Sequence, residues 1–343
     1  MEQSSEYDVA KKLYKEKAKP SAVKDKINEY LSIRIDDIPV GIDEKGIYIL
    51  AKNELRSRHY KEAENLLKIC LKLNPQNINA CLLLGKFYAI RPGKEKEAKD
   101  LFNRCSNVDS KNITARVELG KLYLKQNEEQ KAEKILKECL DIESNNTFAL
   151  LNLGKLYVKQ EKDTPAENLF LECIKIDGDM LEPRLELGKL YALQGRVVEA
   201  EQEFEDCLIV HPKSIPPRVE LSKLLISEGE EERAEKLLKE CLENDSNETT
   251  SRLELGKLYA KQRKFDKATF LFLECLRLNP TSIRPRLELN KIYLEEKEYR
   301  KAEQLINECL EILGNDKTAT DELARQIAII NQYKNDNANL NFR

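Results

Sequence analysis

Cysteine is the residue whose type and spacing in this chain could do chemistry. Seven of its nine cysteines follow one another at intervals of 34 residues, namely Cys105, Cys139, Cys173, Cys207, Cys241, Cys275 and Cys309. Thiolates act as nucleophiles and metal ligands, and nearby pairs of thiols form disulfides. No Cys-x-x-Cys pair occurs in the sequence, and the long fixed interval instead indicates one structural unit repeated along the chain.

Other motifs that carry chemistry are also absent from the sequence. The two histidines, His59 and His211, are far apart and fall in predicted turns, so we do not expect a histidine-based site. No P-loop or dinucleotide-binding glycine motif occurs. Cys81 lies outside the regular series and could lie near Cys70, but a redox or metal-binding pair is not expected there. We therefore predict a protein that is not an enzyme and that has no metal or cofactor.

The residues between the cysteines predict two helices in each unit. Leu119 and Tyr123 are four residues apart, so they share one face of a first helix. Ala132 and Cys139 are seven residues apart and share one face of a second helix, and the break falls near Asn127. Small residues on these faces let the two helix axes approach closely. The cysteine is accordingly interpreted as a compact apolar filler.

The pattern resembles the tetratricopeptide repeat. It combines a 34-residue unit with Leu-Gly-x-x-Tyr on the first helix, helix A, and with alanine and a small residue on the second, helix B. The family's common tryptophan is missing, and cysteine replaces its usual alanine on helix B. The resemblance implies an all-α, right-handed superhelical solenoid of about eight helix-turn-helix repeats with helical caps. The predicted repeats cover residues 44–316, as 44–77, 78–112, 113–146, 147–180, 181–214, 215–248, 249–282 and 283–316.

The two ends of the chain depart from the repeat. Residues 1–43 are predicted to form an N-terminal helical cap and linker, with a partner-binding segment as the alternative. Residues 317–343 are predicted to form a C-terminal capping helix and a flexible tail that begins near Lys334. Such caps cover the apolar faces of terminal repeats.

Composition disfavours two classes of partner. The net charge is −3 and the pI is about 5.9, so bulk electrostatics do not favour nucleic acid or an anionic membrane. We find no signal peptide and no apolar run long enough to span a bilayer. We therefore expect a cytoplasmic protein with reduced thiols, and without a role at a membrane.

A regular set of charged residues marks a candidate binding surface. In the repeat that this chain resembles, helix A lines the concave face. Lysine follows the glycine position in all eight units, glutamate precedes this lysine by three residues in five units, and an aliphatic residue precedes that glutamate. The predicted partner-binding residues are Glu118, Lys121, Leu151, Lys155, Leu185, Glu186, Lys189, Glu220, Lys223, Leu253, Glu254, Lys257 and Lys291.

Two interpretations of these rows remain open. The glutamates and lysines could pair with one another and only keep the groove soluble. Alternatively, the groove could accept a peptide, with the aliphatic residues as anchors. The predicted function is a non-catalytic protein–protein interaction scaffold or adaptor that binds a peptide or protein segment. RNA or single-stranded DNA binding through the lysines, and a peptide-responsive regulatory receptor, are the alternatives, and the sequence does not determine the oligomeric state.

A second regular feature lies nearer the predicted core. Five units carry an arginine on helix A where the family has tryptophan, and the same five carry an acid just before the cysteine. The pairs are Arg116 with Glu138, Arg184 with Asp206, Arg218 with Glu240, Arg252 with Glu274, and Arg286 with Glu308. We expect an ion pair within about 4 Å between the two helices of each unit.

Overall fold

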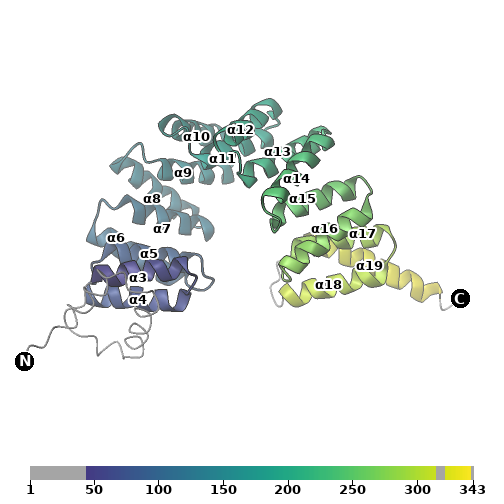
Figure 1. Ribbon diagram of the computed structural model, residues 1–343, viewed down its shortest axis with the longest axis horizontal. Coiled ribbons are helices and arrows are strands. Elements are labelled where there is room, and N and C mark those ends of the chain that lie inside the picture. The colour runs from purple at the N-terminus through teal and green to yellow at the C-terminus, as the bar shows by residue number, and fades with distance from the viewer. Residues whose placement is uncertain (1–43, 314–320, 341–343) are drawn as a thin grey trace, which may run out of the picture. The chain divides into compact units, whose positions relative to one another are not determined.

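The computed structural model describes residues 44–313 and 321–340, and every regular element in these residues is an α-helix (Figure 1). The chain divides into two compact units, with the division after Leu169. The described helices of the first unit are α3 (Glu44–Arg56), α4 (Tyr60–Leu73), α5 (Ile78–Ala89), α6 (Glu95–Val108), α7 (Ile113–Lys125), α8 (Glu129–Ile142), α9 (Thr147–Lys159) and the first half of α10 (Asp163–Ile176).

The second unit starts in the second half of α10 and contains the remaining nine described helices. These are α11 (Leu181–Leu193), α12 (Val197–Val210), α13 (Ile215–Glu228), α14 (Glu231–Asn244), α15 (Thr249–Lys261), α16 (Phe265–Leu278), α17 (Ile283–Glu295), α18 (Tyr299–Leu313) and α19 (Asp321–Leu340).

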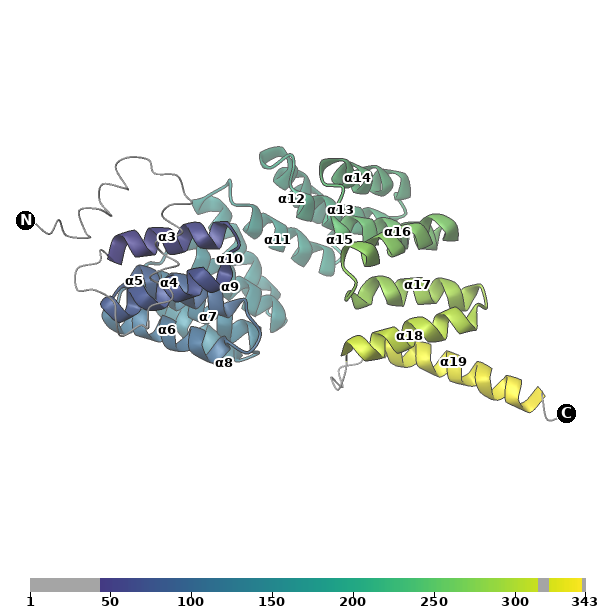
Figure 2. The same cartoon turned by 60° about the horizontal axis from the view of Figure 1, so that its bottom comes forward.

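Consecutive helices form antiparallel pairs within each unit (Figures 1 and 2). The pair α15 and α16 illustrates this antiparallel arrangement. The thiol of Cys275, near the end of α16, donates to the carbonyl of Thr249 at the start of α15, at 3.6 Å. Within each unit, one pair then packs against the next pair along the chain. The predicted all-α, solenoid-type stack of helix pairs is therefore confirmed.

Short polar signals set the ends of the helices. Asn112 caps α7, because its side-chain oxygen accepts a 2.9 Å hydrogen bond from the backbone nitrogen of Ala115. Between α7 and α8 the chain turns at Asn127, whose φ is 59°. Asparagine tolerates this left-handed conformation better than most residues. The predicted break near Asn127 is thus confirmed.

Close contact between paired helices depends on the size of two facing residues. A Cβ atom on Gly256 would lie 2.5 Å from Cε1 of Phe272, and one on Gly188 would lie 2.6 Å from Cε1 of Phe204. Where the position has a larger residue, as with the buried Ser222, the residue that corresponds to phenylalanine is the smaller Leu238. In these pairs a small side chain on one helix faces a large side chain on the other.

The described ends differ in part from the predictions. Residues 1–43, the predicted N-terminal cap, lie outside the described residues. The last helix, α19, buries Leu323 and Ile330 against α17 and α18. It continues to Leu340, past Lys334, where the flexible tail was predicted to begin. No proline or glycine interrupts this segment, and extending an existing helix costs little compared with starting one.

Candidate binding surface

The regular cysteines are part of the packing between helices. All nine cysteines of the chain are free and buried. In several units the thiol donates to the carbonyl of the first residue of the paired helix, as Cys70 does to Glu44 at 3.3 Å. Alanine could fill the same space but could not make this contact. The hydrogen bond gives a physical reason for cysteine at this position.

Burial makes these thiols poor nucleophiles. Desolvation raises the pKa of Cys139, Cys207 and Cys275 to about 11, well above the ordinary value of 9.0. Cys81 interacts with Cys105, and this interaction together with desolvation raises the pKa of the Cys105 thiol.

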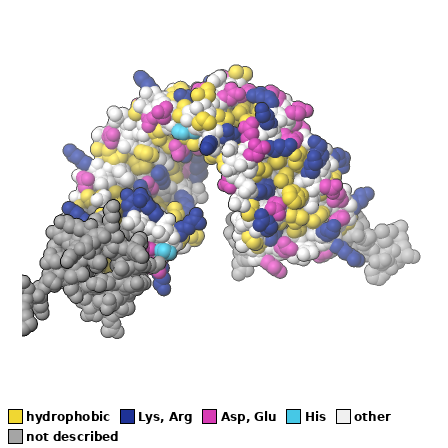
Figure 3. All heavy atoms as spheres, in the orientation of Figure 1, with side chains coloured by type: hydrophobic (Ala, Val, Ile, Leu, Met, Phe, Trp, Pro, Cys, Tyr) yellow, Lys and Arg dark blue, Asp and Glu magenta, His cyan; other side chains and the backbone are white. Residues whose placement is uncertain are grey.

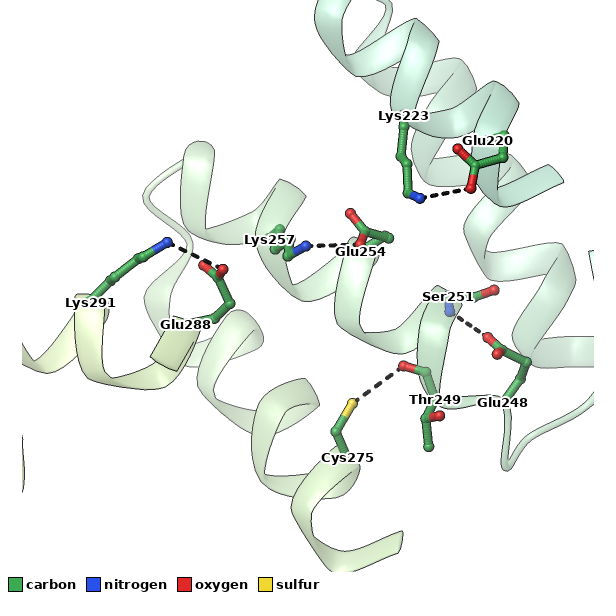
Figure 4. A network of polar contacts seen from close by, with 10 residues as sticks. All are labelled: Glu220, Lys223, Glu248, Thr249, Ser251, Glu254, Lys257, Cys275, Glu288 and Lys291. Carbon is green, nitrogen blue, oxygen red and sulfur yellow. Dashed lines mark hydrogen bonds and ion pairs between the residues drawn. The ribbon is translucent and has the colours of Figure 1, made fainter. Parts of the chain in front are cut away.

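The predicted rows of glutamate and lysine form ion pairs within their helices (Figure 4). Five of the pairs are three residues apart, and their N–O distances lie between 2.9 and 3.3 Å. We call these pairs the Glu–Lys row: Glu118–Lys121 on α7, Glu186–Lys189 on α11, Glu220–Lys223 on α13, Glu254–Lys257 on α15 and Glu288–Lys291 on α17.

The Glu–Lys row also connects neighbouring repeats. Glu118 pairs with two lysines, Lys121 on its own helix and Lys86 on α5. Each N–O distance is 3.3 Å. Lys155, on α9, is half-buried. Charges of both signs are interspersed on the face shown in Figure 3. The interpretation in which these residues pair with one another therefore describes their contacts correctly.

The aliphatic residues beside this row lie in the core. Leu151, Leu185 and Leu253 are only 5%, 7% and 7% exposed. Little of these three side chains is therefore exposed for use as anchors, as the peptide-binding interpretation requires. Each precedes the glycine of its own helix by three residues, so it lies on the same side of the helix as that packing position.

The predicted arginine–acid bridges are confirmed in four of the five units. The shortest N–O distances are 2.9 Å for Arg116–Glu138, 3.3 Å for Arg184–Asp206, 3.7 Å for Arg218–Glu240 and 3.1 Å for Arg286–Glu308. In the fifth unit Glu274 instead pairs with Arg277, at 3.0 Å. The change follows from sequence, because Arg277 stands one helical turn after Glu274 and competes for it.

Each of these arginines also holds the loop before its helix. Arg116 donates to the carbonyl of Ser110 at 2.9 Å, and Arg286 donates to that of Ser282 at 2.9 Å. Loop carbonyls and an acid on the partner helix thus converge on one guanidinium, which has five N–H donors to satisfy them. The arginine links its own helix to the preceding loop and to the partner helix, whereas an aromatic side chain would only fill the space between them.

One buried polar contact was not anticipated from the sequence. Asn290 replaces glycine in the last repeat, and its side-chain nitrogen donates to Oε1 of Gln326 on α19 at 2.8 Å. Both residues are almost completely buried. The exception to the repeat was visible in the sequence, but its partner was not, because the two residues are 36 positions apart.

The described residues contain no group of three or more His, Cys, Asp and Glu side chains placed to hold a metal ion. None of the described helices has the length and apolar character needed to cross a lipid bilayer.

Pairs of antiparallel helices that repeat along the chain define an α-helical repeat protein. Residues 113–146, 149–180 and 249–282 match the tetratricopeptide repeat family. The family model matches three repeats, whereas eight were predicted. The repeat boundaries outside these three ranges remain predictions. No curated protein sequence matches the chain.

Solved structures share this fold at low sequence identity. Yeast Tom70 has a TM-score of 0.65 and 14% identity, with 88% of this chain and 66% of that chain covered. A tetratricopeptide repeat protein from Parabacteroides merdae has a TM-score of 0.59 and 20% identity, with 73% and 98% covered. A chain of the APC/C hetero-tetramer Cut9-Hcn1 has a TM-score of 0.56 and 17% identity, with 77% and 52% covered. The present chain thus spans about half the length of that last chain.

Proposed function

We propose that this protein is a non-catalytic scaffold or adaptor, and that it binds a peptide or protein segment along the part of the Glu–Lys row that lies in the second unit. Proteins built from tetratricopeptide repeats are generally protein–protein interaction scaffolds. The observation that carries the proposal is the regular recurrence of Glu–Lys pairs in the second unit. There, four successive A helices each present one ion pair, and the lysines keep 36–44% of their side-chain surface exposed.

The pairing determines which kind of segment would fit. Each glutamate holds its lysine in place, so the row offers charges of both signs in a fixed geometry. A segment with alternating acidic and basic side chains could exchange partners with these pairs without leaving a charge unpaired. Because the helices are rigid before binding, only the incoming segment would lose much conformational entropy.

The same pairing counts against the nucleic-acid alternative. A phosphate backbone binds to lysines whose charge is available, and affinity then falls steeply as salt increases. Here a carboxylate neutralises each paired lysine, and repulsion between that carboxylate and phosphate opposes binding. We expect a generic oligonucleotide to bind weakly, and tight binding with a steep salt dependence would favour the alternative.

Charge reversal on the row provides the test. The variant combines Lys189→Glu, Lys223→Glu and Lys257→Glu, and proteins captured by it from native lysate are compared with those captured by the wild type. We expect the loss of a specific protein partner, whose direct binding is then measured with purified components. A Lys-to-Gln version of the triple variant separates loss of charge from like-charge repulsion.

A matched control reverses lysines on B helices. Lys68, Lys137 and Lys239 also pair with a glutamate on their own helix, at 2.7, 2.7 and 2.6 Å. Reversing these three makes the same change in net charge on the other helix of each pair. Partners retained by this control but lost by the row variant support the proposal. Equal loss from both variants, or from neither, would reject the row as the binding surface.

A further inference from the structure

Helix α16 breaks the repeat at two exposed positions. Phe270 is 64% exposed and Leu273 is 49% exposed. In the other seven repeats, the position of Phe270 is always polar: Asn65, Asp100, Lys134, Asn168, Gln202, Lys236 and Gln304. The position of Leu273 is polar in six of the seven, with Leu171 as the exception. Two large apolar side chains, three residues apart, therefore project from one outer face of α16.

Charged residues of opposite sign flank this apolar pair on the same face. Asp266 lies one turn before Phe270, and Arg277 lies one turn after Leu273. Eleven residues separate the two charges, which is about three helical turns and about 16 Å along the axis. They are therefore too far apart to pair with each other. Both are exposed, Arg277 by 64% of its side-chain surface.

We infer that α16 is the contact surface of a homodimer in which two copies of this chain pack their α16 helices antiparallel about a two-fold axis. The four residues are placed symmetrically about the midpoint between Leu271 and Phe272. A two-fold axis at that point sets Phe270 of each copy against Leu273 of the other. It also sets Asp266 of each copy against Arg277 of the other, at both ends of the contact.

The existing contacts of the two charged residues are compatible with this arrangement. Arg277 uses its Nε and one terminal nitrogen on Glu274, at 3.0–3.1 Å. A guanidinium has five N–H groups, so its other terminal nitrogen can donate to Asp266 of the second copy. Within the described residues, Asp266 makes no ion pair.

An open hollow of about 360 Å³ adjoins the apolar pair, between α15 and α16. Phe270 and Leu271 line it together with Tyr259 of α15. It gives the large side chains of a second copy apolar surface to cover beside the helix contact. A single helix face with its flanks remains a small interface, so we expect dissociation in the micromolar range.

Analytical ultracentrifugation of the full chain across micromolar concentrations tests the inference. We expect a reversible monomer–dimer equilibrium for the wild type. The variant Phe270→Lys/Leu273→Lys takes the residues that α14 has at these positions, Lys236 and Lys239, and should weaken dimerisation by at least about tenfold. Its circular dichroism and melting temperature should stay near those of the wild type, because both side chains are largely exposed. Gln202→Lys, at the position of Phe270 on α12, is the matched control and should dimerise normally.

A charge-swap cycle tests the antiparallel register. Asp266→Arg and Arg277→Asp should each weaken the dimer, because each places like charges opposite one another at both ends. The double variant restores opposite charges across the two-fold axis and should recover most of the affinity. A wild type that stays monomeric overturns the inference. So does a dimer that survives Phe270→Lys/Leu273→Lys, or a double variant no tighter than its parents. Binding of a different protein through Phe270 by a monomeric wild type would also overturn it.

Discussion

Asn290 and Gln326 join the last repeat to the final helix through a buried amide–amide hydrogen bond. The Asn290 side chain donates to Gln326 at 2.8 Å, and Gln326 in turn donates to the carbonyl of Leu287 at 3.2 Å. A buried amide without partners is costly, so this contact favours one position of α19 over shifted ones. Asparagine stands at position 290, where most repeats have glycine, because its amide binds Gln326 of α19.

We expect Gln326→Leu to loosen α19. The change leaves the Asn290 amide buried without its acceptor, which should lower the free energy of unfolding by about 1–3 kcal/mol. Hydrogen exchange of the α19 backbone should accelerate more than that of α15 or α16, because each repeat contacts only its neighbours. Replacing both residues, as Asn290→Leu/Gln326→Leu, should recover part of the loss. Exchange that stays unchanged in α19 would show that the amide pair does not hold this helix.

Glycine at the helix contact should be intolerant of a single methyl group. In Gly256→Ala, the new Cβ would meet Cε1 of Phe272 at 2.5 Å. We expect a loss of about 1–3 kcal/mol in chemical denaturation, as for other overpacked cores. Adding Phe272→Leu should restore much of it, since Ser222, a residue larger than glycine, already occurs with leucine, Leu238, at the corresponding positions. Gly46→Ala is the control, because no atom lies within 4 Å of its new Cβ, and it should be neutral or stabilising.

The arginine between helices should contribute more than an exposed ion pair. Arg286 is 9% exposed and contacts both Glu308 and the carbonyl of Ser282. Arg286→Ala leaves these acceptors without their donor, and we expect a loss of about 1–3 kcal/mol. Arg263→Ala removes a pair with Glu295 in which the arginine side chain is 77% exposed, and should cost less than about 1 kcal/mol. Equal effects of the two variants in urea denaturation would contradict a structural role for Arg286.

Stability should decrease in alkaline solution because of the buried thiols. The pKa of Cys139 is about 11 in the folded chain, against an ordinary value of 9.0. The unfolded thiol therefore loses its proton first, and the contribution of Cys139 is complete below pH 9 and is lost as pH rises towards 11. Each such thiol adds a slope of up to about 1.4 kcal/mol per pH unit in that range. Cys139→Ala should show a shallower decrease than the wild type in denaturation from pH 8 to 11, and identical slopes would rule out this cause.

The sequence alone determined the repeating helix pairs and several of their internal contacts. The 34-residue period identified the unit, and the leucine, glycine and alanine positions identified the packing faces. The Glu–Lys pairs could be foreseen because residues three apart on a helix must be neighbours. The link between Arg286 and Glu308 was also accessible, because its two members change together from one repeat to the next.

Only the tertiary structure decided which side chains face solvent and which distant residues meet. It placed Leu151, Leu185 and Leu253 in the core, although spacing along one helix cannot show how far a neighbouring helix covers a face. It showed that Glu274 forms its ion pair with Arg277 and not with Arg252. It also brought Asn290 to Gln326, since their contact depends on how α19 crosses α17. Periodicity fixes the direction in which a side chain leaves its own helix, whereas its partner depends on the distances and crossing angles between helices.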